Sequence, residues 1–125
     1  MAQRILVVDD TPQNIKLLGD LLGAKGYEVT TAANGEQALA SIAAQPPDLV
    51  LMDIQLPGIN GIEAFKQIRA DESTAKIPVV ALTASATPTD RSQITAAGFD
   101  AFISKPINLK EFVETVKRLV DGGKK

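Results

Sequence analysis

Asp53 is a carboxylate at the end of an apolar stretch. It directly follows residues 49–52 (Leu-Val-Leu-Met), whose composition is that of a protein interior. A carboxylate that ends a buried segment costs free energy unless it is paired or used chemically. Carboxylates can attack phosphoryl groups and form aspartyl phosphates. Asp53 is therefore a candidate phosphoryl acceptor.

Polar residues end other apolar runs in the same way. In chain order, the residues at these ends are Asp9 and Asp10, then Asp53, then Thr83, then Ser104 and Lys105. Singly, each has an ordinary interpretation, since Asp10 suits a helix cap, Thr83 suits a strand and a lone lysine is usually solvated. Their repeated position after apolar runs favours a common site.

Three carboxylates in one place would repel one another unless a cation lay among them. Oxygen ligands in a chain without His or Cys favour a hard ion such as Mg²⁺, with Mn²⁺ able to substitute. Mg²⁺ prefers one or two carboxylates together with waters and phosphate oxygens, so a phosphoryl group would complete the site. Lys105 would then act as a point charge, Thr83 as a hydroxyl donor and Asp53 as the nucleophile. The chain has no His, so the phosphoryl group must come from another molecule.

The apolar runs themselves indicate five short strands. They cover residues 5–8, 28–32, 49–52, 79–82 and 101–103. Apolar residues at helical spacing predict helices from Thr11 and Pro12 to Gly26, around residues 38–43, 62–68 and 90–97, and over residues 109–119. The helix at 90–97 has a thin apolar face, with Ile94 as its only large aliphatic residue.

Alternating strands and helices are typical of a parallel sheet that helices cover on both faces. We expect a doubly wound α/β fold of the flavodoxin-like type, with five parallel strands in the order 2-1-3-4-5 and five helices. One domain should cover residues 1–121, with a frayed tail at 122–125. The functional crevice of such sheets lies beyond the carboxyl ends of the strands, where the polar residues would converge.

Composition limits the classes of partner. The 125 residues suit one domain, and a net charge of −2 without charged blocks indicates neither a nucleic-acid groove nor a membrane surface. The absence of Cys is compatible with a reducing cytoplasm, where we expect the protein. Without His or Cys, Ser-His-Asp triads, thiol chemistry and the usual zinc sites are excluded.

Two other phosphate-handling classes fit the sequence poorly. A flavodoxin-like FMN binder needs a Ser-, Thr- and Gly-rich loop after its first strand, where this chain has two acids, Asp9 and Asp10. A haloacid-dehalogenase-type phosphatase has acids two positions apart, whereas these two are adjacent.

Four segments resemble, in order, the signatures of response-regulator receiver domains. They are ILVVDD (5–10), DLVLMDIQLPGINGIE (48–63), IPVVALTA (77–84) and FISKPI (102–107), and together they span nearly the whole chain. The resemblance implies Asp53 as phosphoacceptor, with Asp9, Asp10 and the backbone carbonyl of Gln55 as metal ligands. It also implies Lys105 bound to the phosphoryl group, and Thr83 and Phe102 as a coupled switch pair.

The same resemblance implies partners. A histidine kinase or a histidine phosphotransfer protein would supply the phosphoryl group, and the face formed by the fourth helix, fifth strand and fifth helix would bind a downstream protein. We expect a monomer or weak dimer that is not an enzyme beyond its own phosphorylation and dephosphorylation. Two alternatives remain open, a receiver scaffold that takes no phosphate and a relay intermediate that passes the group on.

Overall fold

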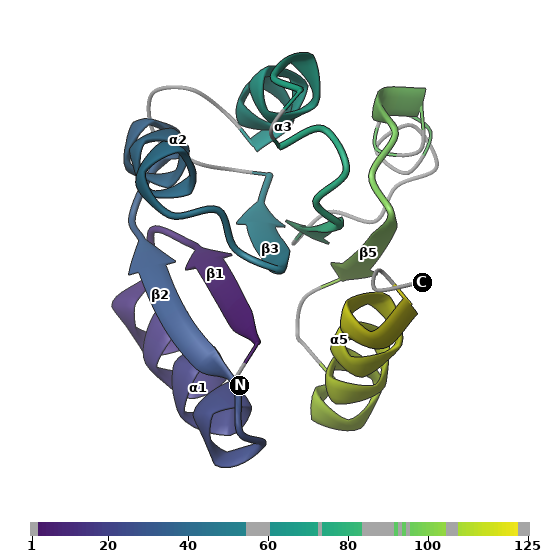
Figure 1. Ribbon diagram of the computed structural model, residues 1–125. Helices are drawn as coiled ribbons and strands as arrows, with labels where there is room; N and C mark the ends of the chain where they lie inside the picture. Colours follow the sequence, from purple (N-terminus) through teal and green to yellow (C-terminus); the bar gives the residue numbers. More distant parts are fainter. Residues whose placement is uncertain are drawn as a thin grey trace.

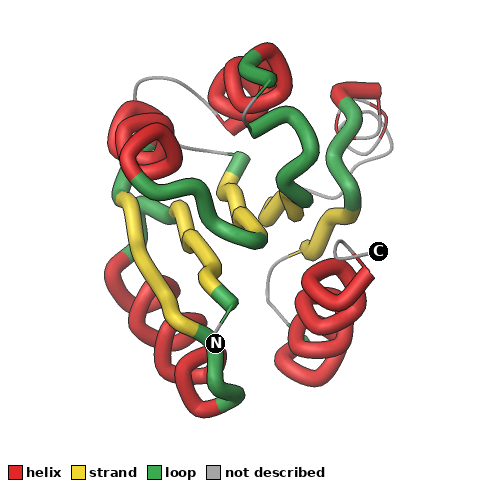
Figure 2. Tube along the Cα trace, viewed as in Figure 1, coloured by secondary structure: helices red, strands yellow, loops and turns green. Residues whose placement is uncertain are grey.

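The computed structural model describes residues 3–54, 61–72, 74–83, 92, 94, 96–104 and 108–122. Strands and helices alternate along the chain (Figures 1 and 2). The strands are β1 (Arg4–Val8), β2 (Glu28–Ala32), β3 (Leu49–Asp53), β4 (Val79–Thr83) and β5 (Ala101–Ser104). The helices are α1 (Pro12–Ala24), α2 (Gly35–Ala44), α3 (Gly61–Ala70) and α5 (Leu109–Gly122). No helix within these ranges is both long and apolar enough to cross a membrane.

The five strands form one parallel sheet in the order β2-β1-β3-β4-β5, which confirms the expected strand order. The central strands β1, β3 and β4 are buried along nearly their whole length. Burial on both faces explains why these strands are continuous apolar runs in the sequence. The carboxyl ends of β1 and β3 are in register, with Val8 opposite Met52.

Helices cover both faces of the sheet, and each face has its own core. On one face, Leu18 and Leu22 of α1 and Phe112 and Val116 of α5 pack on the sheet, and Figure 1 shows these two helices on the same side. On the opposite face, α2 and α3 contribute a second apolar cluster that includes Phe65. The sheet is therefore fixed from both sides.

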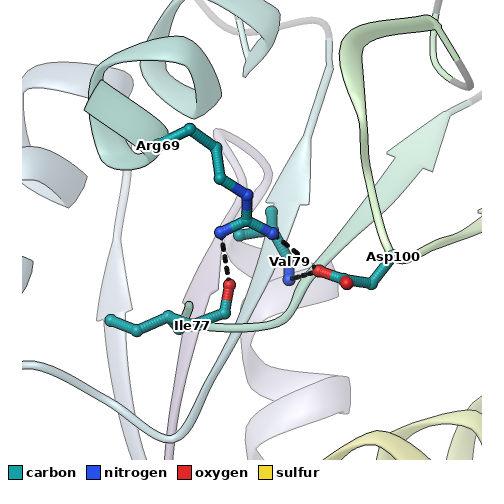
Figure 3. A network of polar contacts seen from close by, with 4 residues as sticks. All are labelled: Arg69, Ile77, Val79 and Asp100. Carbon is teal, nitrogen blue, oxygen red and sulfur yellow. Dashed lines mark hydrogen bonds and ion pairs between the residues drawn. The ribbon is translucent and has the colours of Figure 1, made fainter. Parts of the chain in front are cut away.

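A polar cluster joins α3 to the amino ends of β4 and β5 (Figure 3). One carboxylate oxygen of Asp100 accepts hydrogen bonds from Nη2 of Arg69 (2.8 Å) and from the backbone N–H of Val79 (2.8 Å). The other terminal nitrogen of Arg69 donates to the carbonyl of Ile77 (2.6 Å), and its guanidinium lies 4.7 Å from the ring centroid of Phe65. We call these contacts of Arg69 and Asp100 the Arg69 clamp. It lies where β4 and β5 begin, whereas Asp9 and Asp53 lie at the carboxyl ends of the parallel strands β1 and β3, at the other end of the sheet.

Most expected element boundaries agree with the structure to within a few residues. Asp53, Thr83 and Ser104 are the last residues of their strands, each one residue beyond the apolar run that predicted the strand, and Ser104 was expected to follow its strand. The first helix ends at Ala24, two residues earlier than expected, and Gly26 has a positive φ of 94° that ends the helical path.

Two expected segments at the edges of the described chain need separate comment. Of the fourth predicted helix at 90–97, only residues 92, 94, 96 and 97 are described, and these are helical. Gly122, which we expected in a frayed tail, is the last residue of α5, and residues 123–125 lie outside the described residues.

Candidate metal and phosphoryl site

Three carboxylates meet at the carboxyl ends of the two central strands β1 and β3. One oxygen from each of Asp9, Asp10 and Asp53 lies within 4.8 Å of the others. Asp9 is fully buried and Asp53 is 3% exposed, whereas Asp10 is exposed to solvent. The cluster therefore has a buried side and an open side, and the expected convergence of these three residues is confirmed.

The end of β3 is held on two sides. The backbone N–H of Ile54 donates to the carbonyl of Leu82 on β4 (2.9 Å), and the carbonyl of Ile54 accepts from the backbone N–H of Gly61 at the start of α3 (3.0 Å). Gly61 is buried against this backbone so closely that a methyl group in place of its hydrogen would overlap the carbonyl oxygen of Asp53. The position of Asp53 thus depends on the absence of a side chain at Gly61.

Asp9 is oriented by the start of α1. Its Oδ1 accepts from the backbone N–H of Thr11 (2.9 Å), and its Oδ2 accepts from Nδ2 of Asn14 (3.3 Å). Thr11 is the N-cap residue of α1, but its side chain makes no capping hydrogen bond. The positive end of the α1 dipole faces the carboxylates, and the first turn of this helix contains no acidic residue that would reduce its positive potential.

The donor set fits a divalent metal ion of the Mg²⁺ type. All three groups are carboxylates, the ligands that hard cations prefer. Three negative charges this close cannot neutralise one another, and the burial of two of them increases the free-energy cost of leaving them without positive charge. A divalent cation bound by Asp9, Asp10 and Asp53 would offset this repulsion, with its remaining positions on the open side.

Thr83 and Phe102, the expected switch pair, lie on the neighbouring strands β4 and β5. Thr83 is 3% exposed and ends β4, in register with Ser104 of β5. Phe102 is half-buried and lies opposite Ala81. Gln55 and Lys105, expected as metal ligand and phosphoryl-binding residue, lie outside the described residues.

Sequence reasoning missed two residues that shape the site. Gly61 lies just before the helix predicted around residues 62–68, and its contact with Asp53 joins two elements whose packing the sequence does not display. Asn14 was not considered at all. A signal for Asn14 was available, because asparagine is a poor helix former and lies here in the first turns of a helix, five residues after Asp9.

A doubly wound parallel sheet with three carboxylates at the ends of β1 and β3 defines the class of α/β domain that carries its site beyond the carboxyl ends of the strands. The model of the response regulator receiver domain family matches residues 5–117. The chain belongs to this family and is a receiver domain of two-component signal transduction.

Relatives and solved structures agree with this assignment. The polar-differentiation response regulator DivK of Brucella anthropi is 43% identical over 117 residues, which are 94% of this chain and 95% of DivK. The chemotaxis protein CheY4 of Vibrio cholerae is 28% identical with a TM-score of 0.89, covering 95% of this chain and 99% of CheY4.

A third similar structure bears on the metal. The receiver domain of the sensor histidine kinase PA1611 from Pseudomonas aeruginosa is 36% identical, with a TM-score of 0.89 over 97% of this chain and 99% of that one. That protein has a magnesium ion coordinated in its active-site cleft. The oxygen-only donor set of Asp9, Asp10 and Asp53 suits the same ion.

Proposed function

We propose that this receiver domain accepts a phosphoryl group on Asp53 while Asp9 and Asp10 hold Mg²⁺ beside it. The observation that supports this most strongly is the cluster itself, in which a nearly buried carboxylate at the end of β3 lies within 4.8 Å of two others. Mg²⁺, when bound, would neutralise charge on the transferring oxygens. We propose the backbone carbonyl of Gln55 as a further ligand, with Mn²⁺ as a substitute ion.

We propose a phosphohistidine on a partner protein as the donor, as membership of the receiver family suggests, and this chain has no histidine of its own to carry the group. An oxygen of Asp53 attacks the phosphorus atom, and the bond from phosphorus to the histidine nitrogen breaks as the new oxygen bond forms. The electron pair of the broken bond returns to the imidazole ring, whose other nitrogen carries a proton, so that the leaving group is a neutral imidazole. Lys105 and Thr83 contact the phosphoryl oxygens of the product and stabilise their charge.

The phosphoryl group becomes a signal through Thr83 and Phe102. Thr83 is buried at the end of β4, and Phe102 is half-buried on the adjacent strand β5. If the Thr83 hydroxyl turns toward the phosphoryl group, it vacates space that the Phe102 ring can enter. The output surface is then the face that includes Ile94, β5 and α5, and its partner is a downstream protein.

The test is labelling with acetyl phosphate and Mg²⁺. The wild type should gain one acid-stable, hydroxylamine-labile phosphate, and Asp53→Asn should gain none, because an amide is not a nucleophile for this reaction. Asp20→Asn is the matched control, since Asp20 is an exposed acid on α1, and this variant should be labelled fully. Labelling of Asp53→Asn at the wild-type level would refute the proposal.

A further inference from the structure

We propose that Asn14 is a positioning residue of the metal site, whose side-chain amide holds the carboxylate of Asp9 in the orientation that binds Mg²⁺. This inference rests on the proposed function, because it assigns a residue to the same metal site. Asn14 lies in the first turns of α1 and is partly buried. It does not belong to the group of three carboxylates.

The geometry fixes both oxygens of Asp9. The backbone N–H of Thr11 donates to one and Nδ2 of Asn14 donates to the other, so the carboxylate cannot rotate without losing a hydrogen bond. Each carboxylate oxygen has about two acceptor sites, so these two hydrogen bonds by themselves leave acceptor capacity for a cation. Two donors from the same end of α1 therefore orient Asp9 without using up its ligand capacity.

The chemistry of the amide suits this role. Asn14 donates a hydrogen bond without adding charge, whereas a lysine at this position would compete with the cation and an acid would increase the repulsion. The separation of 3.3 Å is at the long end of the hydrogen-bond range, and the contact joins two residues only five positions apart, so it does not tie distant elements of the fold together. Alanine would be the better helix former at position 14. The presence of an amide side chain at position 14 is therefore better explained by the orientation of Asp9 than by a contribution to folding stability.

The experiment measures Mg²⁺ affinity by isothermal titration calorimetry in the absence of any phosphodonor. Asn14→Ala should raise the Kd for Mg²⁺ about tenfold, the lower end of the effect of removing a residue that orients a metal ligand. Gln13→Ala is the matched control, because Gln13 is the exposed neighbour in the same helical turn, and its Kd should equal that of the wild type. The midpoint of thermal unfolding without Mg²⁺ should be no lower in either variant than in the wild type, because alanine is the better helix former at both positions.

A second variant separates orientation from packing. Asn14→Leu keeps the number and branching of the side-chain heavy atoms but has no donor, and it should weaken Mg²⁺ binding as much as Asn14→Ala does. Phosphate labelling gives a further readout, since the half-saturating Mg²⁺ concentration should rise by the same factor while the rate at saturating Mg²⁺ stays within about twofold of the wild type. Wild-type affinity in either variant would overturn the positioning role.

The outcomes also distinguish this inference from the proposed function. If the wild type binds Mg²⁺ and both Asn14 variants bind it equally well, only the role of Asn14 fails. If the wild type itself binds no Mg²⁺, the metal site fails, and the role of Asn14 fails with it. A rate defect that persists at saturating Mg²⁺ would likewise overturn the inference, because orientation of a metal ligand predicts a defect in metal affinity.

Discussion

Replacement of Gly61 by alanine should disturb the strand end that carries Asp53. In the structure, α3 begins at Gly61 directly against the backbone of β3, and the two segments are joined by the hydrogen bond from Gly61 to Ile54 (3.0 Å). A methyl group at Gly61 would overlap the carbonyl oxygen of Asp53 and lie 2.8 Å from Cα of Ile54. All of the atoms that obstruct it belong to the backbone, so no flexible side chain can make room.

The size of the effect follows from this geometry. Carbon atoms in contact are normally about 3.5–4.0 Å apart, so the start of α3 or the end of β3 must move by about 1 Å. Overpacking of this kind typically costs about 1–3 kcal/mol. For a domain of this size, a loss of about 2 kcal/mol lowers the unfolding temperature by roughly 8 °C. The displaced end of β3 should also slow phosphate labelling of Asp53.

Thermal unfolding followed by circular dichroism is the assay, and Gly23→Ala is the control. Gly23 lies within α1 with nothing within 4 Å of an added methyl group, so alanine there should stabilise the protein by about 0.5–1 kcal/mol. The two glycine-to-alanine changes therefore have opposite expected signs. An unfolding temperature of Gly61→Ala at or above that of the wild type would refute the close-approach argument.

Three further predictions concern the metal, the Arg69 clamp and the switch. Mg²⁺ at a hundredfold excess over its Kd should stabilise the wild type by about 2.7 kcal/mol, and Asp10→Ala should lose most of this gain, with thermal unfolding as the measurement. If the unfolding temperature of the wild type does not change with Mg²⁺, the three carboxylates do not bind one shared ion. Asp100→Ala should lower the free energy of unfolding, measured in urea, by about 1–2 kcal/mol, because the N–H of Val79 loses its acceptor and Arg69 loses its ion pair. A decrease of less than about 0.5 kcal/mol would contradict this. Thr83→Ala should still be labelled at Asp53 but lose much of the amide NMR response of β5 and α5 to beryllofluoride, and a full response would exclude the switch role.

The sequence predicted the sheet and the three acids because both depend on local patterns. Buried parallel strands appear as short apolar runs, and a polar residue after such a run is visible without any knowledge of packing. Once the strand order was expected, the convergence of Asp9 and Asp53 followed from the parallel register. The apolar runs place the ends of the strands one residue too early, because a buried aspartate or threonine can be the last residue of a strand.

The contacts that hold the site and sheet together could not be predicted in the same way. Arg69 and Asp100 are 31 residues apart, and neither belongs to an apolar pattern or a known motif in the sequence. The fit of Gly61 against Asp53 depends on the packing angle of a helix on a strand, which no periodicity encodes. The contact between Asn14 and Asp9 depends on one side-chain orientation. Such contacts become visible only when distant elements are placed together.

The Arg69 clamp also has a consequence for how the domain opens. Because one oxygen of Asp100 serves both Arg69 and the backbone N–H of Val79, fraying at the start of β5 would at the same moment remove a hydrogen bond from the start of β4 and the ion pair from the last turn of α3. Local unfolding with such shared contacts is cooperative, and hydrogen exchange detects it as one unit. The amide of Val79 should therefore exchange together with its neighbours in β4 and β5. We therefore expect this end of the sheet to open as one cooperative unit, separately from the opposite end, which carries Asp9 and Asp53.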